Sequence, residues 1–145
     1  LSKLILNNVD SIKTQAEQQL FMRSVKIELR APHVKVSENL RLRPWLFYAL
    51  YGNYPSSITA LRIGDLVFVG TPCDFSGELV GRFDVISQRK NIETIVTSFN
   101  GGYVGYITDD KWYNVNEPET RHMNWFGPYN GAYFTEMIQE VLETM

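Results

Sequence analysis

The spacing of apolar residues changes early in the chain. Near the N-terminus apolar residues recur every three or four positions, which predicts an amphipathic first helix, and they are Ile5, Val9, Ile12, Ala16 and Leu20. The period then falls to two, because Val25, Ile27 and Leu29 alternate with charged residues. This alternation predicts a strand with one face in water.

The strongest strand signal lies between residues 58 and 69. Gly64 and Asp65 separate two apolar arms, and this pair of residues favours a tight hairpin. The second arm is apolar on both faces, so we expect a central strand. Residues 45–51 follow Pro44 and are apolar enough to pack, but their pattern does not distinguish a helix from a strand.

Strands and helices alternate through the rest of the chain. The pattern predicts a helix over 76–88, a buried strand over 92–98 and a closing helix over 129–143, the last with Tyr133, Met137, Ile138 and Val141 on one face. This order indicates an α/β fold with a mixed β-sheet flanked by helices. The chain opens without Met and closes inside or just after a helix, so we treat residues 1–145 as a single region and expect a partial domain cut from a longer protein.

Composition removes several classes of function. The formal net charge is -2, which gives no electrostatic footprint for nucleic acid. No apolar run approaches the roughly 20 residues that a transmembrane helix needs. Cys73 is the single cysteine and has no intramolecular disulfide partner, and two histidines, His33 and His122, do not make a self-contained histidine metal site.

Two segments place polar residues where a strand ends, which is where ligands gather in layered α/β proteins. Asp74 follows the strand that ends near Gly70, where a carboxylate either caps the next helix or binds a metal, and capping is the more common role. Tyr103 and Tyr106 follow the strand that ends near Asn100. Both tyrosines would face a ligand there, although such residues more often serve in packing.

The C-terminal third carries weaker candidates. Glu119 and His122 are spaced for one helical face, and we expect a surface ion pair between them. Asp109 and Asp110 are expected to cap a short helix, with ion binding as the alternative. An aromatic cluster would line a groove for a lipid or sugar, or else pack in the core, and it comprises Trp112, Tyr113, Trp125, Phe126 and Tyr129.

Three segments, in order, resemble the neutral/alkaline (non-lysosomal) ceramidases. Residues 61–75 (LRIGDLVFVGTPCDF) are similar to a stretch of that family that reads roughly LRIGDLxxxGxPGEF, and Gly81-Arg82 continues the likeness. Residues 100–108 (NGGYVGYIT) resemble its N-x-Y-x-x-Y-(I/V)-T stretch, with one added residue before Tyr103. Phe126-Gly-Pro128 with Ala132-Tyr133 resembles its Y-G-P…A-Y segment, so the likeness covers roughly residue 55 to the end.

The resemblance implies a zinc amidohydrolase that cleaves the N-acyl bond of a sphingolipid-like substrate. In that family two histidines, a Glu and a Tyr hold zinc, and a Ser takes part in cleavage. Asp74 stands at the position of the Glu and Tyr106 at that of the Tyr, whereas the histidines and the Ser belong to upstream sequence that His33 and His122 do not match. The chain would therefore be the C-terminal portion of the catalytic domain, inactive alone, from a secreted or periplasmic protein.

Two departures from the family pattern keep a second reading open. Asp74 replaces Glu and shortens the side chain by one methylene, and Cys73 replaces Gly, either as a compensating thiolate ligand or as a small buried residue. The alternative is a non-catalytic ceramidase-like module that binds a ligand or partner. For either reading we expect apolar surface that drives self-association through the first helix and residues 45–51.

Overall fold

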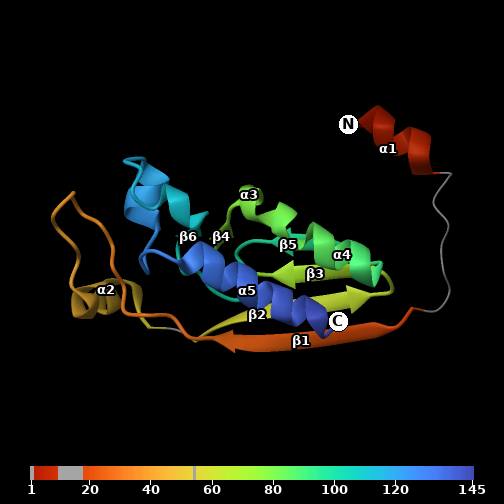
Figure 1. Cartoon of the computed structure of the whole chain (residues 1–145), viewed down its shortest axis with the longest axis horizontal. Helices are drawn as coiled ribbons and strands as arrows, with labels where there is room; N and C mark the ends of the chain where they lie inside the picture. The colour runs from red at the N-terminus through yellow and green to blue at the C-terminus, as the bar shows by residue number, and fades with distance from the viewer. Residues whose placement is uncertain (1, 10–17, 54) are drawn as a thin grey trace.

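A mixed four-stranded sheet forms the centre of the fold. The computed structural model describes residues 2–9, 18–53 and 55–145. The strand order is β1-β2-β3-β5, with antiparallel pairing from β1 to β3 and parallel pairing between β3 and β5. Figure 1 shows this sheet with helices packed on it, which confirms the predicted fold class. The four strands are β1 (Leu20–Ile27), β2 (Ser56–Ile63), β3 (Leu66–Gly70) and β5 (Glu93–Thr97).

Short elements connect the strands, and one long helix closes the chain. A second sheet of two strands comprises β4 (Asp74–Phe75) and β6 (Tyr106–Ile107). The helices are α1 (Ser2–Val9), α2 (Pro44–Tyr51), α3 (Gly77–Val80), α4 (Asp84–Lys90) and α5 (Asn130–Glu143). Three single turns complete the list: η1 (Gly81–Phe83), η2 (Asp110–Trp112) and the wide π-type turn η3 (Glu119–Met123).

The core lies between one face of the sheet and the helices α4 and α5. Alternate residues of β2 and β3 are fully buried there, namely Ile58, Ala60, Val67 and Val69. From the other side α5 contributes Phe134, Ile138 and Leu142, which are also fully buried. Helix α5 contacts β2 and α4, and α4 contacts β5, so both helices cover the same face. The three- and four-residue spacing along α5 accounts for its single buried stripe.

The opposite face of the sheet carries a row of apolar side chains. Met22 pairs with Leu61, Leu61 with Phe68, and Phe68 with Ile95, so these four residues form one line across the strands. Leu61 and Phe68 are half-buried, whereas Met22 and Ile95 are exposed. Because side chains alternate between the faces of a strand, this row points away from α4 and α5.

The hairpin, the central strand and the position of β5 were predicted correctly, and a first helix is present as α1, but the length of that helix and the burial of β5 were predicted wrongly. Gly64 occupies the turn between β2 and β3 with a φ of +63°, and β3 lies in the middle of the sheet. Leu20 was expected in the first helix but opens β1, where it pairs with Ile63, and Ile12 and Ala16 lie outside the described residues. Strand β5 was expected to be buried but is a partly exposed edge strand, because only one of its faces meets a helix.

The helix expected over 76–88 is broken into three pieces. The closing helix agrees with its predicted bounds to within one residue. Helix α3 runs into the tight turn η1 and then into α4, which ends at Lys90. Asn91 ends α4 in the left-handed conformation, with a φ of 51°, a common way to terminate a helix. Helix α5 begins one residue later than predicted and ends at the predicted position.

Candidate functional site

The two candidate zinc ligands are direct neighbours across a parallel ladder. In the pairing of β4 with β6, Asp74 lies opposite Tyr106 and Phe75 lies opposite Ile107. The Asp74 N–H donates to the Gly105 carbonyl at 3.0 Å, and the Ser76 N–H donates to the Ile107 carbonyl at 2.9 Å. Paired residues project from the same face of a ladder whose strands are about 4.8 Å apart. The register therefore places Asp74 and Tyr106 side by side on one face of this ladder.

Backbone hydrogen bonds join the loop after β3 to the loop after β5. The Asn100 N–H donates to the Thr71 carbonyl at 2.8 Å, and the Val104 N–H donates to the Pro72 carbonyl at 2.8 Å. Gly105 then passes close to another segment, since a Cβ on it would lie 2.2 Å from the Met123 carbonyl oxygen. Its φ of +87° also favours glycine. These contacts fix the position at which β6 begins, and so the position of Tyr106.

Asp74 does not serve as a helix cap. It lies in β4, and Ser76 occupies the position that precedes α3. The helix-capping role considered for Asp74 is therefore wrong. Asp74 and Tyr106 are both half-buried.

Cys73 is a fully buried side chain beside this pair. Burial raises the pKa of its thiol to about 12, a hydrogen bond with Thr71 opposes that shift, and the charge of Asp74 adds to it. The thiol therefore stays protonated at neutral pH, whereas zinc binds the thiolate. Of the two roles considered for Cys73, the small buried residue agrees with its environment.

The described residues do not contain a complete metal site of the usual kind. Among them no three or more His, Cys, Asp and Glu side chains gather closely enough to hold an ion. His33 contacts the Ala31 carbonyl at 3.0 Å through Nδ1, and His122 contacts the Lys35 carbonyl at 3.2 Å in the same way. The expected Glu119–His122 ion pair is absent from the ion pairs of the described residues. Asp74 and Tyr106 would thus supply two of the four ligands that zinc normally takes.

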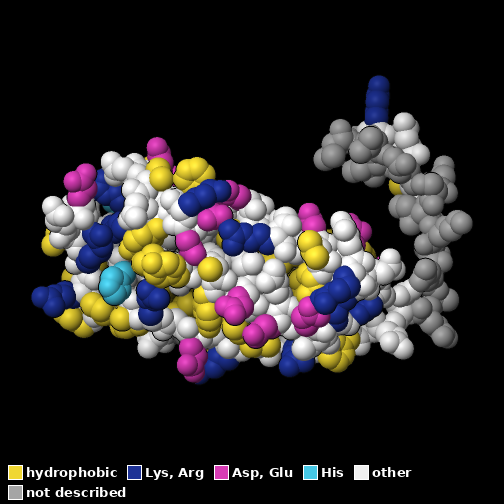
Figure 2. Space-filling model, viewed as in Figure 1, with side chains coloured by type: hydrophobic (Ala, Val, Ile, Leu, Met, Phe, Trp, Pro, Cys, Tyr) yellow, Lys and Arg dark blue, Asp and Glu magenta, His cyan; other side chains and the backbone are white. Residues whose placement is uncertain are grey.

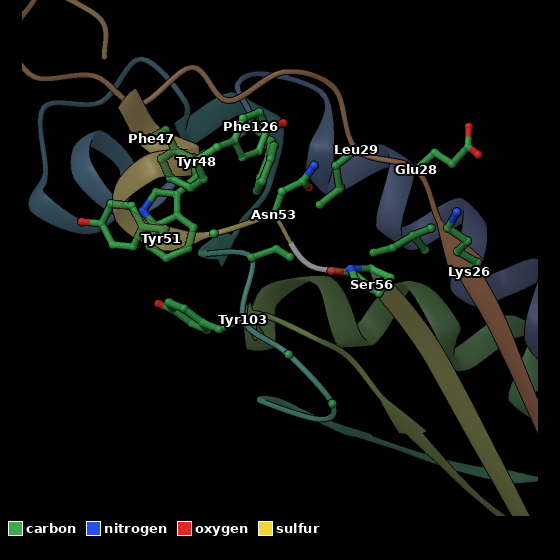
Figure 3. A pocket seen from close by; sticks show the side chains of 17 residues that line it. Lys26, Glu28, Leu29, Phe47, Tyr48, Tyr51, Asn53, Ser56, Tyr103 and Phe126 are labelled. Atoms are coloured by element: carbon green, nitrogen blue, oxygen red, sulfur yellow. The ribbon is translucent and has the colours of Figure 1, made fainter. Parts of the chain in front are cut away.

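An open cleft of about 950 Å³ adjoins the pair and has an aromatic lining. Its aromatic residues are Phe47, Tyr48 and Tyr51 from α2, Tyr103 from the loop before β6, and Trp125 and Phe126 from the segment before α5. The Trp125 ring links the two walls, with its centroid 5.0 Å from that of Tyr103 and 5.0 Å from that of Tyr51. Figure 3 shows Tyr103 across the cleft from the aromatic residues of α2.

The other end of the cleft is mixed in polarity. Lys26, Glu28 and Ser56 line it together with Ile27 and Leu29, and Figure 3 shows Lys26, Glu28 and Ser56 away from the aromatic group. The Glu28 backbone N–H donates to the Tyr133 hydroxyl at 3.2 Å, which ties this end to α5. An apolar channel with polar groups at one end suits a molecule that has an apolar chain and a polar head.

The cleft and the Asp74–Tyr106 pair are adjacent but distinct. Neither Asp74 nor Tyr106 lines the cleft, whereas Tyr103 and Val104 do. Burial raises the pKa of Tyr103, and the nearby charge of Asp74 raises it further. Tyr103 therefore lines the cleft and also lies within the electrostatic reach of Asp74.

The sequence pointed to three of the six aromatic residues that line the cleft: Tyr103, Trp125 and Phe126. Trp125 and Phe126 belonged to the predicted aromatic cluster, but Trp112, Tyr113 and Tyr129 do not line the cleft. The aromatic residues of α2 were missed as a site, because the pattern of residues 45–51 does not distinguish a helix from a strand. In a helix, the spacing of Phe47, Tyr48 and Tyr51 places their side chains along one side. Such a row of aromatic side chains indicates one wall of a binding site.

The fold of this chain is similar to part of two solved ceramidase structures. The chain is similar to the crystal structure of neutral ceramidase from Pseudomonas aeruginosa, with a TM-score of 0.62 and 16% identity over 88% of this chain. It is also similar to a structure described as ceramidase complexed with C2, with a TM-score of 0.57 and 22% identity over 73% of this chain. The chain therefore has a ceramidase-like fold. No protein-family model and no curated protein matches it.

The likeness covers part of those enzymes. This chain spans 29% of the Pseudomonas aeruginosa ceramidase chain and 17% of the other ceramidase chain. Among the described residues, no helix has the length and apolar character that crossing a membrane requires.

Proposed function

We propose that this chain is part of a zinc-dependent amidohydrolase, similar to neutral ceramidase, that cleaves the N-acyl amide bond of a sphingolipid-like substrate. The observation that carries the proposal is the register of Asp74 with Tyr106 beside an aromatic cleft. The ceramidase-like fold supports it. A secreted or periplasmic location of the parent protein is part of the same proposal.

In this proposal Asp74 and Tyr106 supply two oxygen ligands, and two histidines from outside the described residues complete the site. Zinc, when bound, would polarise the amide carbonyl and lower the pKa of a bound water or hydroxyl. The aromatic walls of the cleft hold an apolar chain and keep water from it. Lys26, Glu28 and Ser56 meet the polar part of the substrate at the other end.

A non-catalytic role is the second candidate, and one observation favours it. Among the described residues no three or more His, Cys, Asp and Glu side chains gather closely enough to hold a metal ion. A ceramidase-like module of this kind would keep the cleft as a binding site for an amphiphilic ligand without cleaving it.

Zinc titration of the purified chain tests the first candidate. We expect weak but measurable zinc binding by calorimetry, and we expect Asp74→Asn and Tyr106→Phe each to remove it. Asp65→Asn in the β2–β3 turn and Tyr129→Phe on the surface are matched controls that should bind zinc like the wild type. Binding that survives both site variants would leave the ligand-binding module as the better function.

A further inference from the structure

Three aromatic rings form a box within the aromatic part of the cleft. The Trp125 ring is only 8% exposed and contacts both of the others, with its centroid 5.0 Å from that of Tyr51 and 5.0 Å from that of Tyr103. The two tyrosines are 54% and 38% exposed, and Figure 3 shows them on opposite sides of the cleft. We call Tyr51, Tyr103 and Trp125 the aromatic box, in which Trp125 is the floor and the tyrosines are the walls.

A phenylalanine lies behind the Tyr51 wall. The Phe47 ring stacks on Tyr51, with ring centroids 4.9 Å apart and an interplanar angle of 28°. Phe47 also lies 5.3 Å from Trp125, so these two rings are too close to each other to enclose Tyr51 from both sides. One face of the Tyr51 ring is therefore covered by Phe47, and its other face is left for the cleft that Tyr51 lines.

The Tyr103 wall is built in the same way, by a residue with a strained backbone. The Phe99 ring stacks on Tyr103, with ring centroids 5.5 Å apart and an interplanar angle of 18°. Phe99 has a φ of +61°, which is uncommon for a residue other than glycine, and its N–H donates to the Cys73 carbonyl at 3.0 Å. Phe99 is 61% exposed, so burial does not account for its position. Such strain gathers at functional sites, and here it places a ring behind a wall of the cleft.

The electrostatics of the aromatic box favour a cation. Ring faces carry partial negative charge. Burial and then the charge of Asp74 raise the pKa of Tyr103, so the negative charge of Asp74 reaches this wall. Among the described residues that line the cleft, Lys26 is the one basic residue, and Figure 3 shows it beside Glu28 and away from the tyrosines.

The aromatic box is accessible without any opening of the fold. Both of its walls are partly exposed. Figure 2 shows apolar side chains on the surface at the end of the molecule where Figure 1 places α2, the helix that carries Tyr51. The cleft is concave, and its rings hold one another in place before a ligand arrives, which is typical of sites for small molecules.

We propose that the aromatic box binds a trimethylammonium group, the cation of choline and of phosphocholine headgroups. Such a group has no N–H to donate, so proteins recognise it by surrounding it with aromatic ring faces. Tyr51 and Tyr103 contact the cation from two sides, and Trp125 lies beneath it. Phe47 and Phe99 keep the two walls upright.

The inference goes beyond the proposed function, because the aromatic box needs neither zinc nor an amide bond. Leu29, Val104 and Phe126 also line the cleft and remain available to an apolar chain. The trimethylammonium group has two sources, free choline and the headgroup of a lipid. A lipid would fill the aromatic box and the rest of the cleft together.

Titration of the purified chain in metal-free buffer, followed by saturation-transfer NMR, tests the proposal. The probes are choline and its neutral isostere, in which a quaternary carbon replaces the nitrogen. We expect choline to bind at least about fivefold more tightly than the isostere, because a cation gains attraction from a partly desolvated ring face. No binding of choline, or equal binding of the isostere, would overturn the proposal.

A third probe distinguishes the two sources. Dihexanoylphosphatidylcholine, used below its micelle concentration, carries the same cation with two short chains. Tighter binding than choline assigns the aromatic box to a lipid headgroup, because the chains add apolar contacts. Binding equal to that of choline assigns it to the free cation.

Point variants locate the site. Tyr51→Leu and Tyr103→Leu should each weaken choline binding at least about fivefold, because each removes a ring face and keeps an apolar side chain. Phe21→Leu is the matched control, since Phe21 is 48% exposed on β1 and does not line the cleft. An equal loss in this control would contradict the assignment. Circular dichroism confirms that each variant is folded.

Phe99→Gly separates the support of Tyr103 from the stability of the fold. Glycine adopts a positive φ without strain, so the free energy of unfolding should change little. Choline binding should weaken about threefold, because Tyr103 loses the ring stacked behind it. A loss of stability with unchanged binding would refute the role given to Phe99.

Failure of the proposed function is distinguishable from failure of this proposal. Tyr106→Phe should bind choline as the wild type does, whatever zinc titration or hydrolysis assays show, because Tyr106 does not line the cleft.

Discussion

Asp74 and Tyr106 are paired residues of one parallel ladder, although two helices and a strand separate them in the sequence. The pairing follows from the central sheet. Strands β3 and β5 are parallel neighbours, so the loops that leave their carboxyl ends start side by side. Each loop then contributes one short strand, and β4 and β6 pair. Ligand sites of α/β proteins commonly form at such strand ends.

The position of Tyr106 should depend on Gly105. We expect Gly105→Ala to lower the free energy of unfolding by more than about 2 kcal/mol, because the residue has a positive φ and its Cβ would meet the Met123 carbonyl oxygen. Gly101→Ala is the matched control, since Gly101 has a φ of 70° and open space at its Cβ position. Urea unfolding of both variants measures the difference. Equal losses would show that the contact with residue 123 does not matter.

The chain by itself should not hydrolyse N-acyl sphingosine. The proposed reaction needs a nucleophile and two further zinc ligands that Asp74 and Tyr106 do not provide. A fluorogenic ceramide assay with added zinc measures this, with a complete bacterial ceramidase as the positive control. Turnover that a chelator abolishes would show that the chain holds a complete site and would contradict the expectation.

Asp109 should stabilise the segment after β6 through its charge. Its side chain accepts a hydrogen bond from the Lys111 N–H at 3.2 Å, as a cap of η2, and forms an ion pair with Arg82 at 2.6 Å. We expect Asp109→Ala to cost about 1 kcal/mol of unfolding free energy, the usual cost of losing such a cap. Chemical denaturation measures it, and Glu136→Gln on the exposed side of α5 is a control that should lose far less.

The same residue should contribute to acid unfolding. The Lys111 backbone hydrogen bond, followed by the Arg82 and Lys111 charges, lowers the pKa of Asp109 in the folded chain. Its contribution is therefore fully present above the unfolded-state pKa of about 3.9 and disappears as pH falls through the lower folded value. Asp109→Asn should accordingly flatten the loss of stability below about pH 4. If the variant lost stability below about pH 4 as steeply as the wild type does, that result would argue against this role of Asp109.

Cys73 should be inert towards thiol reagents until the chain unfolds. Its side chain is fully buried and its thiol is protonated at neutral pH, and both features prevent the Cys73 sulfur from attacking a reagent. We expect Ellman's reagent to react with native protein at least about a hundredfold more slowly than with urea-unfolded protein, since reaction requires opening of the core. Rapid labelling of the native chain would show that the loop after β3 opens readily.

The sheet face opposite α5 should promote self-association. Met22 and Ile95 are the exposed ends of the apolar row, and apolar rows on two sheets pack well against each other. We expect Met22→Lys/Ile95→Lys to shift the chain towards monomer in light scattering, because lysine opposes burial. Val85→Lys on α4 is the control and should leave the association unchanged. A wild-type chain that is monomeric at high concentration would refute the expectation.

The sequence determined the local features of this protein, because their causes lie within a few residues. The Gly64-Asp65 turn, the Asp109 cap and the end of α5 were all readable, since each depends on backbone conformation or on nearby hydrogen bonds. The central position of β3 was readable too, because both of its faces are apolar. The motif order suggested the ceramidase-like fold that the structural comparisons then supported.

Only the tertiary structure decided the features that join distant segments. Leu20 fits a helical period, but pairing with Ile63 makes it the start of β1. The cleft joins α2 to Tyr103 and Trp125, and no local pattern links those three parts of the chain. Which apolar side chains stay exposed, from Met22 on the sheet to Trp45 on α2, depends on what the rest of the chain covers. The periodicity of a segment indicates which of its faces is apolar. Whether that face is buried depends on how the whole chain packs, so only the tertiary structure shows which apolar surfaces stay exposed.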